Sequence, residues 1–208
     1  MIKKKHFARA LAIAGFSTLL AAGTLFAADK PTSLDADTVE YDMQTGIVTA
    51  KGDVLMIQGD MKVTGQEAEY NSKTKEGRVE GNVIAVQPSK SMRVTCHKLT
   101  SDAQQHMIAS GDVHGTMEDK TFTGPIVEYF QPQDYVLIRE RGVITSKDGS
   151  FTADEMEGYL KEEHLIGNAE LQRDSDALKA AGDRIESQDG FNKFKITGHA
   201  HLEKGKGK

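Results

Sequence analysis

The strongest constraint on the fold is a unit that recurs six times along the chain, at intervals of about 30 residues. Each copy pairs one β-like run with a turn and a second run that ends in Gly-polar-aliphatic. The clearest copies span residues 36–54 and 68–83. A period of this size indicates one supersecondary unit stacked on copies of itself, because a single unit cannot bury its apolar face alone. The sequence therefore predicts an extended surface rather than one compact core around a pocket.

The composition of the repeats favours strands over helices. Apolar and polar residues alternate with a period of two from Leu34 to Leu202, and Thr, Val, Ile, Tyr and Phe are frequent. Turns of about four to six residues join the runs, so consecutive strands are expected to form antiparallel hairpins. Small residues recur on the apolar face, so either space is left inside or the sheets come close together. We expect an all-β, thin, elongated and partly open roll of about twelve strands, with more where long runs break.

The N-terminal segment, residues 1–27, is predicted to be a secretory signal peptide. Three lysines and Arg9 form a basic region, residues 11–26 form a short apolar core, and Ala27 and Ala28 are small residues suited to cleavage. A retained membrane anchor is the alternative interpretation. Residues 28–202 are then one domain, and residues 203–208 are predicted to be a frayed tail because they contain no apolar residue.

The charge of the mature chain argues against a nucleic-acid partner. Cleavage after residue 27 removes four basic and no acidic residues, which changes the formal net charge from −5 to −9. Phosphate binding needs a cationic face, which this balance does not favour.

The cysteine and the histidines give only weak signals for a chemical site. Cys96 is the only cysteine, so an intrachain disulfide is excluded, and we interpret it as a small hydrophobe on a strand. His97 points to the opposite face of that strand and is poorly placed as its base. If the last strand continues through His199 and His201, these imidazoles form half of a metal site. No third ligand is tied to them by spacing, so we interpret them as a solvated strand end and predict no metal or cofactor.

Carboxylates are numerous, but their positions are those of solvated charges. Glu40, Glu69, Glu128 and Glu157 recur at the same place in their repeats, which indicates repeat architecture. A hydrolase needs two carboxylates that converge in one cleft with separated pKa values. The spacing singles out no such pair, so we predict a protein that is not an enzyme.

The repeats resemble the OstA-like (LptA) family. The resemblance rests on a signal peptide followed by repeats of the form Ala-Asp-x-Val-Glu-Tyr-Asp…Thr-Gly-x-Val-x-Ala-x-Gly-Asp-Val, between Leu34 and Leu202. It is strong in the first two units and weaker in the third and fourth. There Thr100-Ser101 and Phe130-Gln131 replace the Asp or Asn expected after the first strand. The resemblance implies a twisted antiparallel β-jelly roll, open along one side, whose apolar interior shelters acyl chains.

The resemblance also implies a function and partners. Members of the family bind lipopolysaccharide in the periplasm and form a bridge from the inner to the outer membrane. They stack head to tail by β-edge pairing, with copies of themselves, with LptC-like partners at the inner membrane and with LptD-like partners at the outer membrane. The predicted docking edges are the first strand, near residues 34–41, and the last, near residues 194–202. The residues expected to line the lipid groove are Val39, Tyr41, Val48, Val54, Met56, Val79, Val83, Val113, Phe194 and Ile196.

Two alternatives stay open at this point. A retained N-terminal segment would favour an inner-membrane-anchored, LptC-like bridge partner. A closed core would favour a structural β-repeat protein of the envelope, into which no lipid enters.

Overall fold

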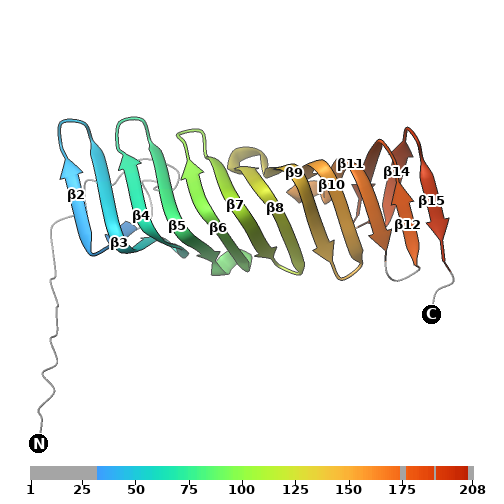
Figure 1. Cartoon of the computed structure of the whole chain (residues 1–208), viewed down its shortest axis with the longest axis horizontal. Coiled ribbons are helices and arrows are strands. Elements are labelled where there is room, and N and C mark those ends of the chain that lie inside the picture. Colours follow the sequence, from blue (N-terminus) through green and yellow to red (C-terminus); the bar gives the residue numbers. More distant parts are fainter. Residues whose placement is uncertain (1–31, 174–176, 190, 206–208) are drawn as a thin grey trace, which may run out of the picture.

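The computed structural model describes residues 32–173, 177–189 and 191–205, so the predicted signal peptide lies outside the described residues. Antiparallel strands lie side by side along one long axis, with the first strands at one end and the last at the other (Figure 1). They form one open sheet whose first and last strands do not pair with each other. The predicted all-β, partly open antiparallel roll of hairpin repeats is therefore confirmed.

Long strands dominate the middle of the chain, and short ones lie at its ends. Three single-turn 3-10 helices, η1 (Pro88–Lys90), η2 (Gln131–Gln133) and η3 (Leu160–Glu162), fill turns. Within the described ranges, no helix is long and apolar enough to span a membrane. The strands are β1 (Thr32–Asp35), β2 (Thr38–Asp42), β3 (Ile47–Gln58), β4 (Met61–Asn71), β5 (Glu76–Gln87), β6 (Met92–Ser101), β7 (His106–Met117), β8 (Lys120–Phe130), β9 (Tyr135–Ser146), β10 (Gly149–Tyr159), β11 (His164–Arg173), β12 (Leu178–Ala181), β13 (Arg184–Gln188), β14 (Lys193–Thr197) and β15 (His201–Lys204).

A bend divides each long strand, β3 to β11, into two parts. In β3 the pairing register with β4 shifts at Gly52 and Asp53, which both have left-handed backbones (φ +76° and +45°). The Gly-polar pairs at 81–82 and 111–112 repeat this conformation. A bulge that starts with a left-handed glycine bends a strand and increases its twist. The Gly-polar pair of the first three sequence repeats is therefore a bend in the structure.

The bends separate the sheet into two layers, and one hydrophobic cluster contains residues from both. Layer 1 comprises β2, 47–51, 67–71, 76–80, 98–101, 106–110, 126–130, 135–139, 155–159, 164–167, β13 and β14. Layer 2 comprises β1, 54–58, 61–65, 83–87, 92–96, 113–117, 120–124, 142–146, 149–153, 169–173, β12 and β15.

The bend also explains why there are more than twelve strands. At the two ends of the roll the chain breaks at the bend instead of bulging, so β1 and β2 lie along different parts of β3. In the same way β12 and β13 share β11, and β14 and β15 extend them. The last strand, β15, reaches Lys204 through its pairing with β12, two residues into the segment predicted as a frayed tail. Backbone pairing needs no apolar side chain, and residues 206–208 lie outside the described residues.

Polar side chains fix the turns of the first three repeats. Asp42 Oδ1 accepts hydrogen bonds from the N–H groups of Gln44 and Thr45, at 2.8 and 3.2 Å. Asn71 does the same in the second repeat, and Asp102 accepts from the Gln104 N–H in the third. In the fourth repeat η2 replaces this arrangement. The Asp or Asn of the repeat is therefore a turn residue rather than a ligand.

Candidate functional site

All ten residues predicted to line a groove lie on the inner faces of the two layers. Their positions follow from the cross-strand register, in which inner residues of neighbouring strands stand opposite one another. In layer 1 one inner row runs across every strand: Val39, Ala50, Ala68, Val79, Leu99, Ala109, Val127, Ile138, Met156, Gly167, Ile185 and Ile196. In layer 2 the corresponding row is Leu34, Met56, Val63, Ala85, Val94, Gly115, Phe122, Ile144, Phe151, Leu171, Ala180 and Leu202.

The remaining predicted residues lie beside these two rows. Tyr41, Val48 and Phe194 belong to a second inner row of layer 1, nearer its turns. Val54, Val83 and Val113 lie beside the bend in layer 2 and are almost completely buried. Seven of the ten predicted residues belong to one hydrophobic cluster or pack against it, whereas Val39, Tyr41 and Val48 lie outside that cluster.

Each inner row ends in an exposed apolar side chain at one end of the roll and in a partly buried one at the other. Val39 on β2 is 42% exposed and Leu202 on β15 is 57% exposed, whereas most residues between them are buried. Each lies on an end strand that pairs on one side only among the described strands, so no further strand covers it. The interior therefore opens at both ends of the roll, next to unpaired strand edges.

The sequence did not single out the largest interior side chains. Ile138, Phe151, Met156 and Leu171 are at most 1% exposed and lie in the fourth and fifth repeats, where the repeat pattern is faint. The period-two alternation of 149–153 was the available signal for Phe151. Phe191 is also buried, but it lies in a turn, where periodicity gives no signal.

A few polar side chains also face the interior. The Tyr129 hydroxyl donates a 2.7 Å hydrogen bond to Asp134 Oδ1, and burial together with this carboxylate raises the pKa of Tyr129. The Lys90 ammonium of layer 2 lies 5.9 Å from the centroid of the same ring, at cation–π distance. Ser187 is 1% exposed, and its Oγ has no hydrogen-bond partner among the described residues. Contacts of this kind connect the two layers along the side opposite the bends.

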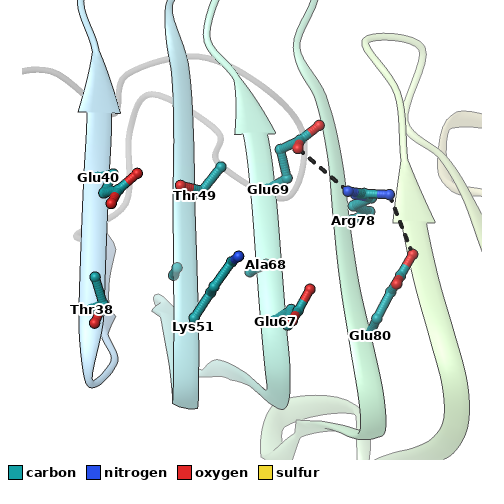
Figure 2. Close-up of a pocket in the computed structure, with 10 residues that line it drawn as sticks. Thr38, Glu40, Thr49, Lys51, Glu67, Ala68, Glu69, Arg78 and Glu80 are labelled. Carbon is teal, nitrogen blue, oxygen red and sulfur yellow. Dashed lines mark hydrogen bonds and ion pairs between the residues drawn. The ribbon is translucent and has the colours of Figure 1, made fainter.

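The outer face of layer 1 carries charge instead. A shallow depression of about 330 Å³ near the first strands is lined mainly by Glu40, Lys51, Glu67, Glu69, Arg78 and Glu80 (Figure 2). Arg78 lies 3.4 Å from Glu69 and 3.5 Å from Glu80, and Lys98 lies 3.0 Å from Glu80. These side chains are between a third and a half exposed, and such surface ion pairs contribute little stability.

Glu128 corrects the interpretation of the recurrent glutamates as solvated. It lies on the outer face as expected, but only 8% of it is exposed. Its carboxylate accepts hydrogen bonds from Arg139 Nε and from His106 Nε2, the latter at 2.8 Å. The His106 ring is stacked on Phe130, with 4.1 Å between centroids, which helps to cover the carboxylate. Although burial alone raises the pKa of Glu128, the hydrogen bonds from Arg139 and His106 outweigh it and lower the pKa.

The other candidate chemical groups are separated. Cys96 is 5% exposed and burial raises the pKa of its thiol, whereas His97 is exposed on the opposite face. The last strand does not continue through the two histidines, because Gly198 and His199 have left-handed backbones. His199 Nδ1 instead lies 2.9 Å from Asp183 Oδ2. Within the described ranges, no three His, Cys, Asp or Glu side chains are placed to hold a metal ion.

Comparison with known proteins identifies the family of the chain. A search of curated proteins gave no match. A solved structure that matches is LptH from Pseudomonas aeruginosa, the LptA homologous periplasmic component of a lipopolysaccharide transport device. It is 17% identical with a TM-score of 0.29, and the match covers 62% of this chain and 76% of that chain. The family model described as LptA/(LptD N-terminal domain) LPS transport protein matches residues 33–188. The chain therefore belongs to the LptA/(LptD N-terminal domain) family of lipopolysaccharide transport proteins.

Proposed function

We propose that this protein is a periplasmic, non-enzymatic bridge protein that carries lipopolysaccharide from the inner to the outer membrane in an apolar groove between its two layers. The observation that carries the proposal is the pair of inner rows, which run from end to end of the roll and leave one apolar side chain exposed at each end, Val39 and Leu202. A closed globular core would bury these ends. Because the chain belongs to a family of lipopolysaccharide transport proteins, we propose lipopolysaccharide as the cargo.

The physical argument for acyl chains rests on area and on the width of the interior. Burial of one CH2 group of an acyl chain contributes about 0.8 kcal/mol to the binding free energy, whatever apolar side chain it contacts. Part of the layer 1 inner row consists of the small side chains of Ala50, Ala68 and Ala109. These side chains leave space for an acyl chain when the two layers move apart. The cargo would enter along the side opposite the bends, where single contacts such as Lys90 with Tyr129 connect the layers.

The same ends provide the docking surfaces for partners. β1 and β2 form one end, β14 and β15 the other, and each pairs on one side only among the described strands. Unpaired edges accept further strands, and different surfaces at the two ends give head-to-tail contacts. We propose pairing with further copies and with LptC-like and LptD-like proteins, after export by the signal peptide of residues 1–27.

Photo-crosslinking tests the groove. A photoreactive residue at Val54 or Val83, on the inner face, is expected to form adducts with purified lipopolysaccharide. One at Thr49 or Lys51, on the outer face (Figure 2), is the matched control and is expected to form none. Equal labelling of both faces, or no labelling of either, would refute the groove. The second outcome would instead favour a structural β-repeat protein with a closed core.

The intact mass of the exported protein tests the N-terminus. The expected mass is that of a chain that begins near residue 28. A mass that retains residues 1–27 would favour the anchored, LptC-like role.

A further inference from the structure

The turn between β13 and β14 places an aromatic side chain in the interior near the last strands. It lies at the end of layer 1, yet Phe191 in this turn is 4% exposed and belongs to the hydrophobic cluster shared by both layers. Its ring is parallel to that of Phe151 on β10 in layer 2, with 6.4 Å between centroids and 3° between planes. Phe191 therefore spans the open side of the roll from one layer to the other.

A backbone contact fastens the turn in this position. The carbonyl of Phe191 accepts a 3.4 Å hydrogen bond from Arg173 Nη1, and Arg173 lies at the end of β11 in layer 2. The Asn192 N–H donates to the Asp189 carbonyl at 3.0 Å, which makes the turn a self-contained loop. Phe191 lies outside the β13–β14 register, so displacement of its ring breaks the contact with Arg173 but none of the β13–β14 pairs.

The backbone of Phe191 is strained. Its φ of +71° lies in the left-handed region, which a side chain of this size rarely adopts. Burial of the ring offsets this strain in the closed position. Residues held in such conformations are found at ligand clamps and switches, where the surrounding structure maintains them.

The inner face of the same hairpin carries a polar group without a partner among the described residues. Ser187 lies on β13, and its register partner Phe194 belongs to the inner row nearest the turns. Its hydroxyl is buried and has no hydrogen-bond partner among the described residues. A buried hydroxyl costs free energy when it is unpaired. An ester or amide carbonyl at the head of an acyl chain is a hydrogen-bond acceptor that suits it.

We infer that Phe191 is a plug that occupies an acyl-chain subsite formed by Phe151, Ile185 and Ser187. This inference rests on the proposed function and adds a control point to it. With Phe191 in place, its ring narrows the interior before the β14–β15 edge. When an acylated amphiphile displaces the ring, its chain lies against Phe151 and Ile185 and a carbonyl of its head accepts from Ser187. Displacement relieves the left-handed backbone and opens the way to the last edge.

The test compares photo-crosslinking of purified lipopolysaccharide at two inner positions, Val54 before the plug and Ile196 beyond it. In the dilute mature protein, Phe191→Ala and Phe191→Gly are expected to raise the Ile196 to Val54 adduct ratio severalfold. The glycine variant suits the positive φ, and circular dichroism verifies that both variants keep their strands. Phe191→Trp keeps a large ring and is expected to keep the ratio low. Met43→Ala, which changes an exposed side chain in another turn of layer 1, is the matched control and should leave the ratio unchanged.

Two results would overturn the inference, and they differ. An unchanged ratio in folded Phe191→Ala and Phe191→Gly proteins that still label at Val54 would refute the plug and leave the groove intact. No adduct at Val54 in any variant would refute the groove, and the plug with it.

Discussion

Replacement of Gly81 by alanine should be far more damaging than its half-buried position at a bend suggests. The backbone of Gly81 has a φ of +84°, and a Cβ atom there would lie 2.7 Å from the Cβ of Gln66 on the neighbouring strand. The left-handed conformation costs an alanine about 1–2 kcal/mol. The crowding adds about 1–3 kcal/mol, as overpacking does elsewhere. The expected loss is about 2–5 kcal/mol, or roughly 10 °C in Tm for a domain of this size.

Urea unfolding followed by circular dichroism measures this loss, and two matched variants isolate its cause. Asn82→Gly changes the next residue, whose φ of +49° glycine adopts freely, so its free energy of unfolding should be unchanged or higher. Gly158→Ala adds the same methyl group where the nearest atom is the flexible Leu165 Cδ2 at 3.2 Å, so its cost should be small. A Gly81→Ala protein within about 0.5 kcal/mol of wild type would refute the claim that the left-handed glycine sets the bend.

Three further predictions concern charge, edges and the thiol. The pKa of Glu128 in the folded protein lies below the ordinary pKa of a glutamate. The ionised carboxylate therefore contributes to the free energy of unfolding above the ordinary pKa, and this contribution is lost as the pH falls through the folded pKa. The stability gap between wild type and Glu128→Gln, measured by urea unfolding, should therefore shrink as the pH falls below the ordinary glutamate pKa of about 4; a gap that is as large in acid as at neutral pH contradicts this. Val39→Glu and Leu202→Glu, which place a charge beside the unpaired end strands, should reduce concentration-dependent light scattering, and Met43→Glu is the exposed control. A wild-type protein that stays monomeric over a dilution of roughly a hundredfold contradicts self-assembly. Native Cys96, with its buried thiol, should resist iodoacetamide until the protein unfolds, and rapid native alkylation detected by mass would contradict its burial.

The local features of this fold could be predicted from the sequence. Alternation with a period of two assigns a side chain to one face of its strand, so the sequence alone predicts that Val79 and Val83 face inward. The recurrent Gly-polar pair marked the bend, although its role as a bulge needed the backbone angles. The Asp and Asn residues after the first strands likewise marked the turns. These signals are local, because each depends only on neighbouring residues and on backbone geometry.

The contacts between distant residues came only from the tertiary structure. Glu128 has the sequence environment of its solvated counterparts, but Arg139 and His106 cover it from the two neighbouring strands. Phe191 lies in a turn without periodicity and is buried because Phe151, forty residues earlier in the sequence, faces it from the other layer. The exposure of Val39 and Leu202 is decided by the absence of a further paired strand at each end of the described roll. Burial depends on what the rest of the chain places opposite a residue, and a repeat pattern carries no information about that.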